Sequence, residues 1–90
     1  MVSRNVYRII QSRQAVKYIE KQDRIFKERI EKAYTEILNN PKDPRKLLKG
    51  FKNKYRHRMG SYRIIYSVCD AKLVIEIILV DSRGQVYNRH

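Results

Sequence analysis

Residues 55–66 read Tyr-Arg-His-Arg-Met-Gly-Ser-Tyr-Arg-Ile-Ile-Tyr, which predicts a strand, a tight turn and a second strand. Gly60 and Ser61 supply the turn. The stretch contains three arginines and three tyrosines. Guanidinium groups match the geometry of phosphate oxygens, and aromatic rings offer a face on which bases stack. This combination indicates a partner with exposed phosphates and bases.

The positive charge of the chain is concentrated around this stretch. The net charge is +12 over 90 residues, yet Asp43 is the only acidic residue between positions 37 and 69. The same window holds nine lysines and arginines. Clustered charge indicates a binding face, although a solvated charge run that serves solubility is the alternative. The candidates for an acidic partner are nucleic acid, an anionic surface and an acidic protein.

The hairpin belongs to a series of three predicted strands in the second half of the chain. These strands are Lys54–Met59, Tyr62–Cys69 and Lys72–Val80. In the first half, Val6–Ile10 is a short β-rich run, and two helices follow it. The order β-α-α-β-β-β predicts an α+β fold. We expect the two N-terminal helices to pack on one face of a mostly antiparallel four-stranded sheet.

Both helices have recognisable beginnings. Ser12 is a suitable cap for a helix that runs to about Gln22, and Asp23 for a second, longer helix that ends at an Asn-Asn-Pro sequence. Residues 41–53 are expected to form a loop with at most one helical turn around Arg45–Lys49. The second helix carries an apolar stripe with the spacing of a helix face that packs on a core, formed by Phe26, Ile30, Ala33 and Ile37.

Successive residues of a strand point to opposite faces, and this sorts the side chains of the first hairpin strand. Lys54, Arg56 and Arg58 share one face, and the residues between them, His57 included, share the other. Three like charges on one face repel unless that face meets solvent or anions. The pattern predicts a phosphate-binding groove on the basic side. It places His57 on the opposite side, where a catalytic role is not expected.

Length and composition set the remaining bounds. Ninety residues predict one domain, spanning residues 1–90. The lone cysteine, Cys69, lies in an apolar run and is predicted to be buried and inert. One cysteine, two histidines and no glycine-rich phosphate motif predict no metal site and no cofactor. No apolar segment reaches the roughly 18 residues of a membrane span, so we expect a cytoplasmic protein without membrane contact.

Several short motifs in a fixed order resemble those of a known family. The pattern Tyr55-Arg56-x-Arg58-x-Gly60-x-Tyr62-Arg63-x-x-Tyr66, preceded by Asn40-Pro41 and Leu48-Lys49-Gly50 and followed by Arg83 and Val86-Tyr87, resembles the RelE toxins of toxin–antitoxin modules. The resemblance covers nearly the whole chain. It implies an endoribonuclease, an mRNA interferase that cuts messenger RNA in the A site of the 30S ribosomal subunit by metal-free attack of the 2′-hydroxyl. It also implies a cognate RelB-like antitoxin, which the charge of the toxin suggests is acidic.

The resemblance also implies a set of site residues. Arg63 is expected to clamp the scissile phosphate, unless it pairs with Glu76 on the next strand. Arg83 is expected on the leaving-group side, and Tyr87 could stack on a base or approach the 2′-oxygen. Carried over by position, the family's functional residues are Arg56, Arg58, Arg63, Arg83 and Tyr87.

One departure from the family concerns the proton acceptor. The best-studied members carry lysine where this chain has Arg56 and Arg58. A lysine can lose its proton in a crowded cationic site, whereas arginine stays charged in proteins. The resemblance therefore assigns no general base here. Four lysines of the same region are expected to contact the RNA backbone in a salt-sensitive manner, namely Lys46, Lys49, Lys52 and Lys54.

Two other functions fit the same sequence. A ParE-like toxin would have the same fold but would bind DNA gyrase and cut nothing. A degenerate member would only bind RNA or its antitoxin. The arginines of the hairpin and the terminal Val86-Tyr87 favour the nuclease, because a protein inhibitor of gyrase needs no such constellation.

Overall fold

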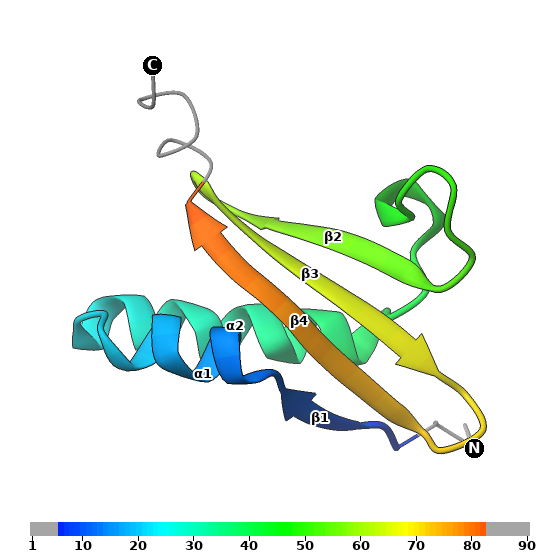
Figure 1. Cartoon of the computed structure of the whole chain (residues 1–90), viewed down its shortest axis with the longest axis horizontal. Coiled ribbons are helices and arrows are strands. Elements are labelled where there is room, and N and C mark those ends of the chain that lie inside the picture. Colours follow the sequence, from blue (N-terminus) through cyan, green and yellow to red (C-terminus); the bar gives the residue numbers. More distant parts are fainter. Residues whose placement is uncertain (1–5, 83–90) are drawn as a thin grey trace.

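The computed structural model describes residues 6–82, and its elements follow the predicted order. A short strand and two helices come first, and three longer strands follow (Figure 1). The elements are β1 (Arg8–Gln11), α1 (Arg13–Glu20), α2 (Arg24–Asn39), the 3₁₀ helix η1 (Pro44–Lys46), β2 (Lys54–Met59), β3 (Tyr62–Cys69) and β4 (Val74–Ser82). The predicted α+β class and its β-α-α-β-β-β order are confirmed.

The strands form one mixed sheet in the order β1-β4-β3-β2. β2, β3 and β4 are antiparallel neighbours, whereas β1 runs parallel to β4, with Arg8 opposite Val74. A tight turn cannot join two parallel strands. The whole segment between Gln11 and Val74, with both helices and the other two strands, forms the crossover from β1 to β4. The register of β3 against β4 shifts between Ile65 and Tyr66. This order leaves β2, with its charged side chains, at one edge of the sheet.

Both helices begin at the predicted cap residues. Ser12 Oγ accepts a hydrogen bond from the Ala15 N–H at 3.1 Å, and Asp23 Oδ1 accepts one from the Phe26 N–H at 2.9 Å. Each cap contributes about 1 kcal/mol, because it satisfies a donor that the first helical turn leaves unpaired. Ser12 Oγ also donates to the Ile78 carbonyl oxygen at 2.7 Å. The residue that starts α1 therefore also ties the helix to β4.

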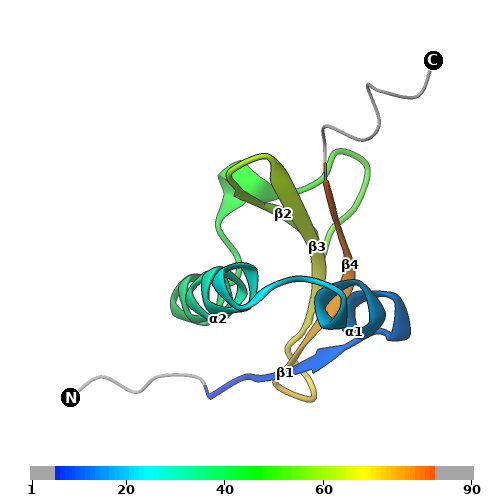
Figure 2. The same ribbon diagram turned by 90° about the vertical axis from the view of Figure 1, so that its left-hand side faces the viewer.

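The core is formed by one face of the sheet, by α2, which lies beside the sheet (Figure 2), and by Ala15 of α1. The predicted stripe of α2 is buried, with Phe26, Ile30, Ala33 and Ile37 each 5% exposed or less. Burying one large apolar side chain contributes about 1.5–3 kcal/mol. The Tyr66 hydroxyl lies inside this core and donates to the Pro41 carbonyl oxygen at 2.9 Å. The largest fully buried side chains on the sheet side are Tyr66, Ile64, Ile75, Ile77 and Val80.

Gln14 of α1 closes the edge of β4 beyond the end of β1. Its side-chain Nε2 donates to the Val80 carbonyl oxygen at 3.0 Å, and its Oε1 accepts from the Val80 N–H at 3.0 Å. A neighbouring strand would make the same two kinds of bond. Gln14 therefore satisfies backbone groups that an uncovered edge would leave open to another chain.

The structure differs from the sequence-based predictions in a few places. The ends of β1, α1 and β4 shift by up to about two residues from the predicted ones, which is usual for such boundaries. The helical turn spans Pro44–Lys46 and does not reach Lys49. The prediction for Cys69 is wrong, because the residue is exposed. It follows the buried Val68 and therefore lies on the opposite face of β3. Within residues 6–82 no helix is long and apolar enough to cross a membrane.

Candidate nucleic-acid interface

β2 presents its charged side chains on the side of the sheet away from α2. Residues 55, 57 and 59 are buried, whereas Lys54 and Arg56 are half-buried and Arg58 is exposed. The predicted alternation is confirmed, and we call Lys54, Arg56 and Arg58 the basic row. Alternate side chains of a strand are about 6.7 Å apart, so the charges of the row repel one another. An anion lying along the row would remove that repulsion.

The basic row continues onto β3 through Arg63. Arg63 lies directly opposite Arg58 in the antiparallel pair, so the two side chains share a face. Across the sheet Arg63 is paired with Asp81 of β4, and its Nε donates to Asp81 Oδ1 at 3.2 Å. The carboxylate partner is thus Asp81, and not the Glu76 considered from the sequence. Within residues 6–82 this bond uses only Nε, so both terminal Nη groups are left for an oxyanion.

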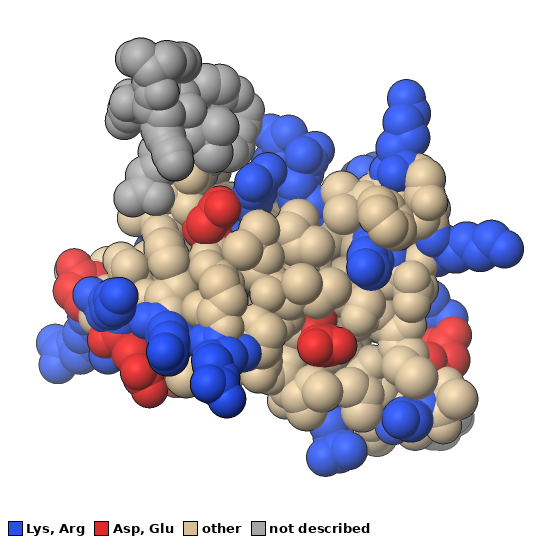
Figure 3. All heavy atoms as spheres, viewed as in Figure 1, with Lys and Arg blue, Asp and Glu red and all other residues tan. Residues whose placement is uncertain are grey.

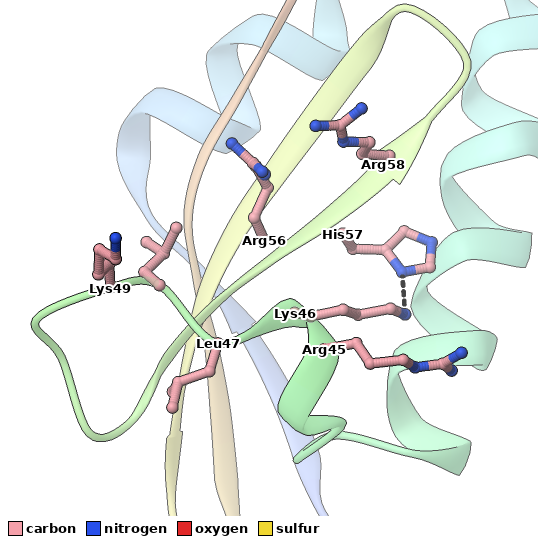
Figure 4. Close-up of a pocket in the computed structure, with 8 residues that line it drawn as sticks. Arg45, Lys46, Leu47, Lys49, Arg56, His57 and Arg58 are labelled. Carbon is pink, nitrogen blue, oxygen red and sulfur yellow. Dashed lines mark hydrogen bonds between the residues drawn. The ribbon is translucent and has the colours of Figure 1, made fainter.

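A hollow of about 810 Å³ lies between β2 and the segment that precedes it (Figure 4). This segment is held to the edge of β2 by a bridge between Leu47 and Tyr55 and by the Leu48 N–H, which donates to the Lys54 carbonyl oxygen at 2.8 Å. No lining residue is acidic, so the hollow attracts anions. The lining residues are Arg45, Lys46, Leu47, Leu48, Lys49, Arg56, His57 and Arg58.

Acidic side chains are unevenly placed around this surface. Over the helices they lie among basic ones, whereas basic side chains project without acidic neighbours around η1 and the loop after it (Figure 3). The exception in sequence, Asp43, is buried and paired: Arg45 donates to it from Nε at 3.1 Å and from Nη2 at 2.8 Å. These bonds lower the pKa of Asp43 to about 2. Asp43 therefore stays ionised while Arg45 balances its charge.

His57 is buried between α2 and η1. Its exposed fraction is 6%, its Nδ1 lies 2.8 Å from Lys46 Nζ, and its Nε2 lies 3.2 Å from Glu36 Oε1. Since an ammonium group can only donate, Nδ1 accepts and the ring proton sits on Nε2, facing Glu36. Burial lowers the pKa of His57, the charge of Lys46 lowers it further, and Glu36 opposes both effects. The imidazole is therefore neutral at pH 7.

Comparison with known proteins identifies the family to which this chain belongs. The family model of the ParE toxin of type II toxin–antitoxin systems, parDE, matches residues 9–87. The chain belongs to the RelE/ParE superfamily of type II toxins. A RelE-like toxin protein of Escherichia coli is 30% identical, over 82% of this chain and 82% of that protein. The mRNA interferase toxin RelE of E. coli strain K12 is 32% identical, over 69% and 70% of the two chains.

Solved structures give the same family. The isolated E. coli RelE toxin superimposes with a TM-score of 0.79 at 28% identity, covering 91% of this chain and 92% of that chain. A chain of the archaeal RelE–RelB complex from Pyrococcus horikoshii OT3 gives a TM-score of 0.71 at 29% identity, covering 88% and 97%. The RelE-like fold expected from the sequence is therefore confirmed.

The predicted site residues of this RelE/ParE toxin fall into three groups. Arg56, Arg58 and Arg63 share one open face of the sheet. Lys49 and Lys52 are exposed, Lys54 belongs to the basic row, and Lys46 turns its ammonium group toward His57 (Figure 4). The predictions for Arg83 and Tyr87 lie outside the described residues. These roles remain predictions, because geometry alone does not test them.

Sequence reasoning missed two residues around the hollow. Arg45, which lines it, was considered only as part of a helical turn, although the Asp43-x-Arg45 spacing is a recognisable local signal for their pairing. Glu36, the partner of His57, was not considered at all. No signal in the sequence links Glu36 to His57, because the two residues lie on different elements and meet only when α2 packs against β2.

The buried histidine predicts a pH dependence of folding stability. The pKa of His57 lies below the ordinary value of 6.5 in the folded toxin. As pH falls below 6.5, the unfolded chain binds a proton that the folded chain does not, so the free energy of unfolding decreases. Urea unfolding between about pH 7.5 and pH 5.5 would measure this decrease. In His57→Met the decrease should be smaller, and equal slopes in the two proteins would refute the assignment.

Proposed function

We propose that residues 1–90 act as one toxin domain, a ribosome-dependent mRNA interferase that cuts messenger RNA in the 30S A site and inhibits translation in the cytoplasm. The observation that carries the proposal is the set Arg56, Arg58 and Arg63 on one open face, beside a hollow that no acidic residue lines. A relative covering most of the chain is an mRNA interferase toxin, which supports the same reaction.

The reaction needs charge stabilisation more than it needs a nucleophile from the protein. The ribose 2′-oxygen loses its proton and attacks the adjacent phosphorus, the bond to the 5′-oxygen breaks, and that oxygen takes a proton. The products are a 2′,3′-cyclic phosphate and a 5′-hydroxyl. The intermediate carries extra negative charge on phosphate oxygens, and donors already fixed at those positions stabilise it. Arg63, held at Nε by Asp81, can present both Nη groups to one phosphate.

The other residues have complementary roles in this proposal. Arg56 and Arg58 lower the cost of forming the 2′-alkoxide by placing positive charge beside it. Arg83 acts on the leaving-group side, and Tyr87 stacks on a base or approaches the 2′-oxygen. No step passes through a metal or a cofactor. His57 is not the base, because its two ring nitrogens are engaged by Lys46 and Glu36 inside the protein.

The proposal includes an acidic RelB-like antitoxin. Similar solved structures include the intact E. coli RelBE toxin–antitoxin complex and the archaeal RelE–RelB complex. A toxin of net charge +12, with a basic face that residues 6–82 leave open, favours an acidic, amphipathic segment that becomes ordered on binding. Such a segment would compete with RNA for the same surface.

Two parallel assays test the proposed activity. Purified toxin is added to a translating extract, and the 5′ ends of a messenger RNA are mapped by primer extension with and without ribosomes. Supercoiling by DNA gyrase is measured with the same toxin preparation. We expect new 5′ ends only when ribosomes are present, and no loss of supercoiling. The absence of ribosome-dependent ends would refute the nuclease.

A second candidate function is inhibition of DNA gyrase. One observation favours it: the family model that matches residues 9–87 is that of the ParE toxin. Loss of supercoiling without RNA cleavage would establish this function in place of the first. If neither RNA cleavage nor loss of supercoiling is observed, the protein is a member that only binds RNA or its antitoxin.

A further inference from the structure

An aromatic ring stands at the end of the basic row, where the sequence analysis assigned no role. Phe51 lies in the loop between η1 and β2 and is 48% exposed. The loop reverses direction just before it: the Phe51 N–H donates to the Leu48 carbonyl oxygen at 3.1 Å, and Gly50 has a φ of +87°. A left-handed φ of this kind favours glycine, and a Cβ at Gly50 would meet nothing within 4 Å. The turn therefore projects from the body of the protein.

The ring is set among cations. Lys54 Nζ lies 5.0 Å from the centroid of the Phe51 ring, within the range of a cation–π interaction. The flanking Lys52 is exposed, and Lys49 lines the adjacent hollow. Lys54 is also the first member of the basic row, so the ring and the two arginines lie along one path. A single exposed phenylalanine needs no explanation by itself, but its position on this path does.

These observations match the two parts of a nucleotide. A base has a flat face that stacks on an aromatic ring, and its phosphate pairs with a cation held nearby. We propose that Phe51 and Lys54 form a stacking site for one unpaired base of single-stranded RNA, adjacent to the Arg56–Arg58 part of the row. The site rests on the proposed function for the source of the RNA, since messenger RNA passing over the arginines would reach it.

RNA fits this place better than a protein segment does. A protein partner that docks through apolar contacts buries a contiguous apolar patch. Phe51 instead has Gly50 and Lys52 beside it in sequence and an ammonium group over its ring. Leu47, another exposed apolar side chain before β2, points away from Arg56 (Figure 4). Stacking also requires an aromatic residue, whereas an apolar protein contact accepts an aliphatic residue of similar size. This difference makes Phe51→Leu the discriminating variant.

The test uses the purified full chain and a fluorescent, 2′-O-methylated RNA oligonucleotide that cannot be cut. Binding is measured by anisotropy at several salt concentrations. Stacking of one base is worth about 5- to 150-fold in affinity, so we expect Phe51→Ala and Phe51→Leu each to bind about tenfold more weakly. Phe51→Tyr should stay within about twofold. The salt dependence should not change in any of them, because no charge is lost.

Two controls separate stacking from other causes. Ile25→Ala removes another exposed apolar side chain, 67% exposed at the start of α2, and should bind RNA as the wild type does. An abasic oligonucleotide removes the stacking partner, so wild type and Phe51→Ala should bind it equally. Wild-type affinity of Phe51→Leu, or a loss that persists with the abasic strand, would overturn the proposal. Loss of antitoxin affinity without loss of RNA affinity would assign Phe51 to the protein partner instead.

The binding test of Phe51 and the assay for RNA cutting can fail independently of each other. If the toxin cuts on ribosomes but Phe51→Leu binds the oligonucleotide normally, the stacking site is refuted and the nuclease stands. If the toxin does not cut but Phe51→Leu and Phe51→Ala lose RNA affinity as expected, the stacking site stands and the nuclease is refuted.

Discussion

Arg63→Ala is expected to lower the rate of ribosome-dependent cutting by about 10²–10³-fold, the usual effect of removing one preorganised donor from a developing negative charge. Arg63 is the member of the arginine group whose guanidinium is fixed by a carboxylate, through the 3.2 Å bond from Nε to Asp81. Its place opposite Arg58 sets it on the face where the phosphate would lie. The measurement is a time course of primer extension at a toxin concentration that saturates the ribosomes.

Three further variants make this result specific. Arg63→Lys keeps the charge but not the two-pronged geometry, so it should restore only part of the rate. Asp81→Asn leaves Arg63 in place but weakens the bond that orients it, so a smaller loss is expected. Arg24→Ala removes an equal charge from the surface of α2, where the side chain is 90% exposed, and should cut normally. If Arg63→Ala also cuts at the wild-type rate, Arg63 does not clamp the phosphate.

The basic row could be predicted because a strand with one buried face allows little freedom. The period of two fixes which side chains share a face, and a slip by one residue would put Arg56 and Arg58 into the core. The Gly60-Ser61 turn fixes where the two strands meet, and the bounds of β2 and β3 agree with the prediction residue for residue.

The carboxylate partner of Arg63 could not be predicted, because it depends on register. The register between β3 and β4 shifts at Ile65 and Tyr66, so Arg63 faces Asp81 while Glu76 faces Ser67. Nothing in the two apolar runs indicates where such a shift occurs. The exposure of Cys69 could not be predicted for a related reason. The run before it is apolar on both faces, and such a run does not show which of its faces the helices cover.

The contacts of the buried His57 were beyond sequence reasoning as well. It joins three elements, since Lys46 ends η1, Glu36 lies in α2 and His57 lies in β2. The position of Lys46 depends on how the loop folds back along the edge of β2, which residue types alone do not determine. The alternation in β2 correctly placed His57 on the opposite face of the strand from the arginines, although His57 also lines the hollow at the edge of β2. Its two partners became visible only in the structure.

Replacing Arg56 and Arg58 together by alanine is expected to reduce cutting by at least about 10³-fold, since each removes a donor near the developing charge. The effects of the two substitutions need not add, because both act on the same phosphate and 2′-oxygen. Neither side chain is part of the core, so thermal unfolding should show a folded protein. A cutting rate of the double alanine variant within tenfold of the wild-type rate would show that Arg56 and Arg58 do not take part in catalysis.

The pair Arg56→Lys and Arg58→Lys separates charge from proton transfer. Lysine keeps the positive charge, so the double variant should cut far better than the double alanine variant. A lysine crowded by cations can lose its proton, whereas arginine stays charged, so the lysine variant should show an additional rise of rate with pH. The wild type should lack that rise, because arginine stays charged in proteins. Identical pH–rate profiles for the two proteins would mean that the proton of the 2′-hydroxyl is accepted elsewhere.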